Sequence, residues 1–154
     1  MNEPNVETSV EQIPPHECWA AMRTVNLGRL GFSVDEEQEI FPLNYVIDQG
    51  TIVFRTSSSS RIGLCLDGRG VAFEADGLSD GLAWSVVVKG HAKEIAGLYD
   101  SIAAAELPVH PLQPGQKPRL VRITANAVTG RRFPVVDGAT WDTPTTSARR
   151  AAPE

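Results

Sequence analysis

The sequence predicts a mainly β protein, an antiparallel barrel or sandwich with a few short helices. Roughly six segments show the apolar–polar alternation of strands, and most of them follow one another through tight turns. Parallel strands need crossover connections of about a dozen residues or more, and most of these segments have shorter connections. The chain has 154 residues, which is the length of one domain.

The N-terminal part is expected to hold an arm and one short helix. Residues 1–13 are acidic and contain few large apolar side chains, which is typical of a flexible arm. Pro14 and Pro15 favour a helix start, and the apolar side chains of 16–23 fall on one face. We therefore expect a short helix directly after the prolines.

Extended segments follow this helix. The acidic run 35–39 predicts a turn, and the tripeptide 48–50 (DQG) predicts a hairpin between its two flanking segments. Strands are expected at 25–34, 40–47, 51–56, 70–76, 82–95 and 119–133.

The remaining segments are expected to be helices, a loop and a tail. Residues 60–68 have the pattern of one or two helical turns, and residues 96–107 have a helical composition. Four prolines predict a surface loop at 107–118. Residues 138–154 lack apolar periodicity, and we expect a flexible C-terminal tail there.

Composition argues against several classes of protein. The net charge of −5 disfavours nucleic acid as a partner, and no apolar run approaches the roughly 18 residues of a membrane span. The acidic N-terminus does not have the pattern of a secretion signal. Cys18 and Cys65 lack a CxxC companion, and the His16–Cys18 spacing lacks a second pair that could complete a metal site. We expect a cytoplasmic protein without nucleic-acid, membrane or metal partners.

The stretch VFRTSSSSR (53–61) is the first candidate binding site. Its four serines offer hydroxyl and backbone N–H donors, Arg61 begins the expected helical turn, and Arg55 ends the strand. A phosphate needs such donors and at least one cation. Serine-rich turns are also common as ordinary surface loops. The residues alone leave both interpretations open.

A second feature lies on the preceding strand. The segment Pro42–Tyr45 (PLNY) is expected to pair with 51–56 through the DQG turn. A proline inside a strand indicates an edge or a bulge, where the ladder of hydrogen bonds is interrupted. Free backbone groups at such a place suit a flat heteroaromatic ring.

Four segments in register resemble the pyridoxamine 5'-phosphate oxidase-like, FMN-binding split-barrel family, and the resemblance runs from about Pro14 to Phe133. It implies a six-stranded antiparallel Greek-key split barrel and a domain at 14–137. It also implies a homodimer that holds one FMN in each groove between subunits. Small actinobacterial members are the most similar. The segments are GRL (28–30), IFPLNYVID (40–48), VFRTSSSSR (53–61) and AWSVVVKGHA (83–92).

The resemblance also implies roles for individual residues. Thr56 and the Ser60–Arg61 pair match the family's flavin- and phosphate-binding motif, while Ile62 stands where the family has lysine, so that Arg55 becomes a candidate replacement cation. Asn44 is alternatively a strand residue that faces water, and Trp84 is alternatively a core residue. The candidate cofactor-binding residues are Pro42, Leu43, Asn44, Arg55, Thr56, Ser57, Ser60, Arg61, Trp84 and Ser85.

The function that this resemblance implies is that of a flavin-dependent oxidoreductase acting on a small-molecule redox substrate. The flavin would carry the chemistry, which agrees with the lack of a recognisable catalytic motif. Basic residues that would grip pyridoxine phosphate have no counterpart, so we do not expect that substrate. The alternatives are a non-catalytic flavin or haem carrier or sensor, a deazaflavin-dependent reductase, and an interaction barrel without cofactor.

Overall fold

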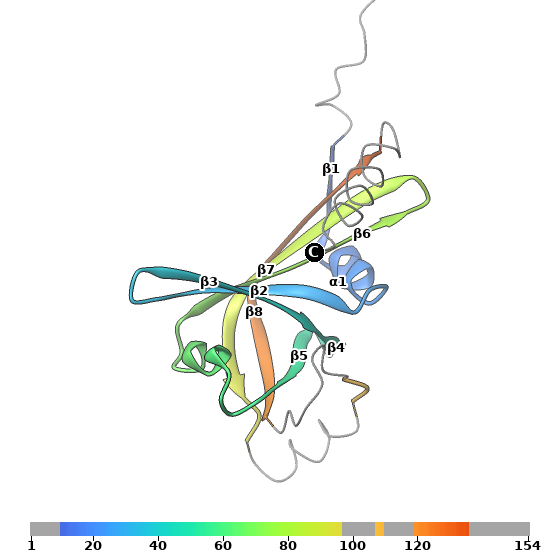
Figure 1. Ribbon diagram of the computed structural model, residues 1–154. Helices are drawn as coiled ribbons and strands as arrows, with labels where there is room; N and C mark the ends of the chain where they lie inside the picture. Colours follow the sequence, from blue (N-terminus) through green and yellow to red (C-terminus); the bar gives the residue numbers. More distant parts are fainter. Residues whose placement is uncertain (1–9, 97–106, 110–118, 136–154) are drawn as a thin grey trace, which may run out of the picture.

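The computed structural model describes residues 10–96, 107–109 and 119–135 (Figure 1). The chain is mainly β, as predicted, with one short α-helix and one 3-10 helix. The helices are α1 (Pro15–Met22) and η2 (Arg61–Cys65). The strands are β1 (Glu11–Ile13), β2 (Leu27–Val34), β3 (Glu37–Asn44), β4 (Val46–Asp48), β5 (Thr51–Thr56), β6 (Gly70–Ser79), β7 (Leu82–Glu94) and β8 (Arg119–Pro134).

The strands form one curled antiparallel sheet, a half-barrel. Its order is β3-β2-β6-β7-β8-β5-β4, and β1 pairs with β8 outside this path. In Figure 1 the ends of β6, β7 and β8 project together beside α1, and the β2–β3 hairpin projects sideways from the body of the sheet. The predicted fold class is therefore confirmed.

Several boundaries differ from those predicted. Glu11–Ile13, assigned from the sequence to a flexible arm, pairs with β8 as strand β1. The expected strand 40–47 is two strands, β3 and β4, because the chain changes its pairing partner at Tyr45. The turn expected at 35–39 is shorter: Asp35 and Glu36, both with positive φ, connect β2 directly to β3. Most of the expected helix at 96–107 and the tail at 138–154 lie outside the described residues.

Strands β3 and β4 therefore pair with different neighbours. Only β4 pairs with β5 through the DQG turn, with Val46 opposite Val53. The segment around Pro42 pairs instead with β2, so the expected pairing of PLNY with 51–56 was wrong. The edge position was correct, because β3 ends the path of the sheet. Proline lacks a backbone N–H, so an edge is the position it tolerates best.

The core lies on the concave face of the sheet, which α1 helps to cover. Alternate residues of the strands are buried there, and the largest fully buried side chains include Phe54, Phe73 and Met22. Tyr45 joins these elements. Its ring packs edge-on against the ring of Phe73, with 4.9 Å between the two ring centroids, and its hydroxyl donates a hydrogen bond to the Met22 carbonyl at 2.7 Å. Burial of apolar side chains, at about 25 cal/mol per Å², is the main stabilising contribution.

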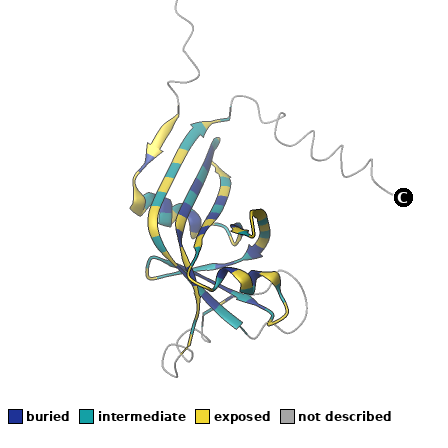
Figure 2. Ribbon diagram, turned by 90° about the vertical axis from the view of Figure 1, so that its left-hand side faces the viewer, coloured by how far each residue is buried: buried dark blue, intermediate teal, exposed yellow. Residues whose placement is uncertain are grey.

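The other face of the sheet, which we call the outer face, carries the intervening residues. Figure 2 shows the resulting alternation of buried and exposed residues along the strands. Residues directly opposite each other in an antiparallel pair lie on the same face. One row across β3, β2, β6 and β7 on the outer face is therefore Pro42, Arg29, Glu74 and Val87.

A bulge shifts the register of β7 against β8 between Lys89 and Gly90. Gly90 is required here because the two backbones approach closely. A Cβ on Gly90 would overlap the backbone oxygen of Thr124 on β8, whereas a Cβ on Gly31 would meet no atom closer than 3.7 Å. Backbone atoms cannot move aside as the end of a flexible side chain can.

We predict that Gly90→Ala lowers the free energy of unfolding by about 2 kcal/mol or more, because β7 and β8 must separate to admit the methyl group. Gly31→Ala serves as the control and should change it by no more than about 0.5 kcal/mol. Urea denaturation followed by circular dichroism measures both. Equal effects of the two substitutions would contradict this account.

Candidate functional site

The serine stretch forms a tight turn between β5 and η2. Thr56, the last residue of β5, is 3% exposed. The Ser60 N–H donates to the Ser57 carbonyl at 3.2 Å, and the Ser60 hydroxyl accepts from the Ile62 N–H at 3.2 Å. The Ile62 N–H at the start of η2 is thus already bonded within the turn and is not free for an anion. Ser58 and Ser59 are exposed, so their hydroxyls remain accessible.

Arg61 is oriented by a carboxylate from another strand. Its Nε donates to the Glu39 carboxylate of β3 at 3.1 Å, and its Nη2 donates to the same oxygen. This hydrogen bond and the opposite charge raise the pKa of Arg61. An anion that binds at Arg61 must therefore share or displace Glu39.

Arg55 does not lie on the same face of β5 as Thr56. Successive side chains of a strand point to opposite faces; Thr56 is buried with the core, while Arg55 is half-exposed. Arg55 is therefore poorly placed to replace the missing lysine beside Thr56. Its binding role stays a prediction, on a separate surface from Thr56.

A cation that the sequence analysis missed lies beside this turn. Arg119 on β8 is directly opposite Thr56, so both side chains lie on one face. A Cβ built on Gly63 of η2 would lie 3.0 Å from the Arg119 guanidinium, which shows that this arginine reaches η2. Its Nη2 donates to Glu94 at 2.8 Å. The only sequence signal was an arginine at the start of the last strand, which does not reveal its partner.

The residues proposed to contact a flavin ring lie on two separate strands. Pro42 and Asn44 lie on the outer face of β3, whereas the Leu43 side chain is buried at 5% exposure and offers only its backbone. Ser85 lies on the outer face of β7, opposite Asp76. Because β2 and β6 intervene, β3 and β7 are about 14 Å apart, at about 4.8 Å per strand.

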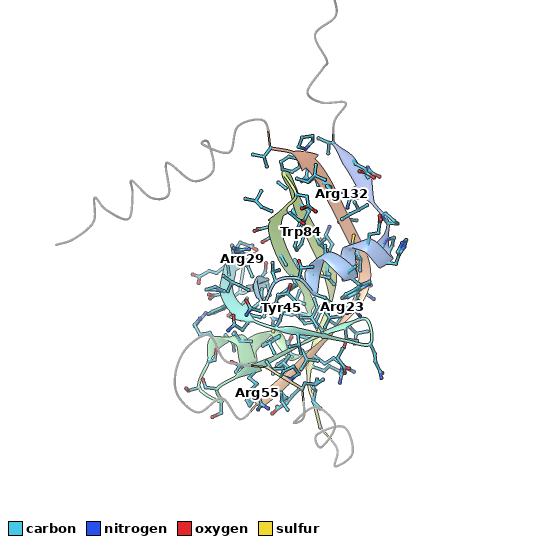
Figure 3. The ribbon with its side chains drawn as sticks, turned by 90° about the vertical axis from the view of Figure 1, so that its right-hand side faces the viewer. Arg23, Arg29, Tyr45, Arg55, Trp84 and Arg132 are labelled. Atoms are coloured by element: carbon cyan, nitrogen blue, oxygen red, sulfur yellow. The ribbon has the colours of Figure 1, made fainter. Side chains whose placement is uncertain are left out.

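Trp84 points the other way from Ser85. Its ring is 5% exposed and belongs to the core, and it packs against Gly77, where an added Cβ would lie 2.8 Å from its Nε1. In Figure 3, Trp84 lies near the projecting ends of the strands and Arg55 at the opposite end of the molecule. One chain thus does not bring the Thr56–Arg61 turn together with Trp84 and Ser85.

A cluster of charges occupies the outer face between Pro42 and Ser85. One nitrogen of Arg29, Nη1, lies 3.0 Å from a carboxylate oxygen of Glu74 and 3.0 Å from one of Asp76. Burial raises the pKa of Glu74 to about 7, and the hydrogen bond and charge of Asp76 add to this, while Arg29 offsets part of it. Near neutral pH this carboxyl is therefore partly protonated.

Two other classes of site receive no support from the described part of the chain. Within it, no three His, Cys, Asp or Glu side chains gather where they could hold a metal ion. No helix of the described ranges has the length and apolar character needed to cross a bilayer.

Comparison with known proteins supplies an independent line of evidence. Residues 14–132 match the family model described as pyridoxamine 5'-phosphate oxidase. A Corynebacterium glutamicum structure, provisionally described as a pyridoxamine 5'-phosphate oxidase, is 34% identical with a TM-score of 0.76, over 89% of this chain and 98% of that one. The FAD binding protein from Mycobacterium smegmatis is 31% identical with a TM-score of 0.71, over 80% of this chain and 98% of that one. An uncharacterised Mycobacterium tuberculosis protein is 28% identical, over 89% of this chain and 93% of its own length.

The raised pKa of Glu74 predicts how stability depends on pH. The folded state binds a proton at Glu74 up to about pH 7, whereas in the unfolded chain this carboxyl loses it near its ordinary pKa of 4.5, so stability falls as pH rises between these values. Glu74→Gln removes the charge. We predict that this variant exceeds the wild type in unfolding free energy by about 1 kcal/mol at pH 8, a figure reduced for partial exposure.

Below about pH 4 the two proteins should be equally stable, because both side chains are then neutral. Urea denaturation at a series of pH values measures the difference. A difference that does not change between pH 4 and pH 8 would show that Glu74 has an ordinary pKa in the folded chain.

Proposed function

Because the chain belongs to the pyridoxamine 5'-phosphate oxidase family, we propose that it binds a flavin and transfers electrons through it to a small molecule. The proposal rests on the family match over residues 14–132, which includes the turn at Thr56–Arg61 and the edge strand at Pro42–Asn44.

The residues around the turn fit the phosphate of a flavin. Arg61 and Arg119 supply two guanidinium groups, and Ser58 and Ser59 offer exposed hydroxyls. Guanidinium groups bind phosphate by charge-assisted, often bidentate, hydrogen bonds. Arg119 would thereby supply the second cation, in place of the family's lysine, whose position Ile62 occupies. Ser60 holds the turn through its hydrogen bond to the Ile62 N–H.

The ring of the flavin would lie against the edge strand. Pro42 and Asn44 present the outer face of β3 there, and Leu43 offers backbone groups. When bound, the flavin supplies hydride acceptance and donation, which is chemistry of the cofactor itself. The chain's own part is to hold the phosphate, to orient the ring and to exclude water. We assign no residue of this chain as an acid or base in the reaction.

FMN is the proposed cofactor. The compact serine–arginine turn favours FMN, which ends at one phosphate. FAD is the second candidate, because the Mycobacterium smegmatis relative with 31% identity is described as a FAD binding protein. A deazaflavin has a longer charged tail and remains the third alternative. A non-catalytic flavin or haem carrier on the same fold is the alternative in which no substrate is turned over.

We further propose that the complete site needs a homodimer. Trp84, next to Ser85 on β7, and Arg55, next to Thr56 on β5, lie at opposite ends of one chain (Figure 3). A second copy is therefore the simplest source of the missing half of the site. In this arrangement Ser85 of one chain would approach the flavin held by the turn of the other. Trp84 would support Ser85 from the core and would not stack on the ring.

The pairing of Arg61 with Glu39 gives a directional test. Arg61→Ala should weaken FMN binding by about 10- to 100-fold, because a charge-assisted contact is lost. Glu39→Gln should strengthen it by about two- to fivefold, because Arg61 no longer has a competing carboxylate. Titration of the purified protein, followed by quenching of flavin fluorescence, measures both affinities.

Riboflavin, which lacks the phosphate, is the matched ligand control, and its affinity should not change in the Arg61 variant. Arg23→Ala, at the exposed end of α1, is the matched protein control. If FMN and riboflavin bind equally well to the wild type, the turn does not hold the phosphate.

Activity separates an oxidoreductase from a carrier. We predict that NADH or NADPH bleaches the visible absorbance of the flavin-loaded protein faster than that of free flavin at equal concentration. The physical reason is that a bound ring is already oriented for hydride transfer. Stopped-flow absorbance in the absence of oxygen measures the rates. Equal rates for bound and free flavin would favour the carrier.

A further inference from the structure

We propose that the cleft between α1 and the projecting ends of β6, β7 and β8 binds a small zwitterion, an α-amino acid with an apolar side chain. Arg132 and Trp84 hold its carboxylate, and Glu17 holds its ammonium group. The cleft lies on the side of the sheet that α1 covers, whereas Ser85 and Pro42 lie on the outer face. The inference therefore goes beyond the proposed function and does not rest on it.

The cleft has a volume of about 350 Å³. Small-molecule sites usually range from about 300 to 1,000 Å³, so this one suits a molecule the size of an amino acid. Helix α1 forms one wall, which includes Glu17 and Ala20, and the sheet forms the floor, which includes Leu82, Trp84 and Arg132. Charged, aromatic and aliphatic groups thus meet in one small space.

The ion pairs of Arg132 are the longest among the described residues. Its Nη2 lies 3.5 Å from an oxygen of Glu11 and 4.0 Å from one of Glu17, whereas the other pairs are 3.0 Å or shorter. A guanidinium has five N–H donors, and this side chain is 30% exposed. Arg132 can therefore bind an entering carboxylate through two parallel hydrogen bonds.

Trp84 supplies a second donor beside this guanidinium. It is directly opposite Arg132 in the β7–β8 pair, so both side chains lie on one face, and Figure 3 shows both near the projecting strand ends. The ring is 5% exposed, and its N–H has no acceptor among the described residues. No side-chain nitrogen or oxygen of these residues is both sealed from solvent and unpartnered, so the N–H is reached from the cleft. A largely buried donor of this kind favours a ligand that brings an acceptor.

The acidic groups of the cleft select a zwitterion over a simple carboxylate. Glu17 lies beside Arg132, and Asp80 borders the cleft from the turn between β6 and β7. Their negative charges disfavour an anion that carries no cation of its own. An α-amino acid has its two charged groups on one carbon, and Glu17 and Arg132 are separated by a similarly short distance of 4.0 Å. The adjacent opposite charges of the ligand therefore match those of the cleft.

The rest of the lining receives an apolar side chain. Ala20 and Ala21 leave room along the helix, and Ile13 and Leu82 offer aliphatic surface. Removal of an aliphatic side chain from water into such a cleft stabilises the complex. A ligand with a branched aliphatic side chain thus uses both the charged and the apolar parts of the cleft.

Isothermal titration calorimetry of the full chain without added flavin, at pH 7, tests the site with three probes. We expect L-leucine to bind with a dissociation constant of about 1 mM or lower. Its isomer 6-aminohexanoate, whose charges lie far apart, should bind at least about tenfold more weakly. The analogue 4-methylpentanoate, which lacks the ammonium group, should also bind at least about tenfold more weakly.

Two variants test the charged groups separately. Arg132→Gln should weaken leucine binding about tenfold or more, because the bidentate contact is lost. Arg131→Gln removes the same charge from the next residue of β8, on the outer face, and should have no effect. Glu17→Gln should weaken leucine binding about threefold or more but strengthen binding of 4-methylpentanoate, because a carboxylate that repels it is gone.

A third variant tests the space itself. Ala20→Leu fills the cleft from the exposed side of α1 and should abolish leucine binding. Thermal unfolding followed by circular dichroism confirms that each variant is folded. Saturating FMN should leave the affinity for leucine within about twofold, because the proposed flavin site uses the other face.

Four results would overturn the proposed site. These are a wild type that does not bind leucine, equal affinities for leucine and 4-methylpentanoate, folded Arg132→Gln and Ala20→Leu variants that bind leucine as the wild type does, and displacement of leucine by FMN. The proposed function does not depend on these outcomes, since flavin binding is measured by its own titration.

Discussion

The register of β7 between its two neighbours is the constraint on which the rest of the structure depends. Val86 and Val88 point into the core and Ser85 and Val87 point outward because β7 pairs with β6 and β8 along nearly its whole length. A slip by one residue would expose the valines and bury Ser85 and Lys89. The core would then lose its packing, and the charge of Lys89 would lose its contact with water, so both changes would destabilise the fold. Gly90 absorbs the one irregularity in this pairing.

The alternation of side chains made much of the fold predictable, and Pro42 correctly indicated an edge strand. Which strands pair with each other was harder to predict. Tyr45 separates two short strands that look continuous in the sequence, because alternation does not show where a strand changes its neighbour. Strand β1 has only Ile13 as a buried residue, so three residues gave no periodic signal. Its pairing depends on β8, far along the chain.

The candidate site shows the same limit at the level of single residues. Thr56 and Arg61 fall beside the same turn because they are close in sequence. Arg119 joins them only through the pairing of β5 with β8, and no local sequence pattern indicates that these two strands pair. Conversely, Arg55 is adjacent to Thr56 in sequence and yet on the opposite face of the strand. Proximity in a strand sequence is therefore a poor guide to a shared site, whereas alternate positions and cross-strand partners are better ones.

The ion pairs of the described cations fit a site that receives an anion. Arg61 is held by Glu39 and Arg119 by Glu94. Exposed pairs of this kind contribute little to stability, because water and salt screen the two charges. They nevertheless keep long side chains in place, and they are weak enough to be exchanged for a phosphate that offers more acceptor oxygens.

The edge strand β3 also bears on how copies of this protein avoid uncontrolled association. An open edge is a template for further strands and hence for aggregation. Along β3, Pro42 cannot donate a hydrogen bond to an added strand, and Glu37 and Glu39 place negative charge near the hairpin end. Growth of the sheet by edge-to-edge addition along β3 is thereby discouraged, so an edge that the fold leaves open does not act as a template for a further strand.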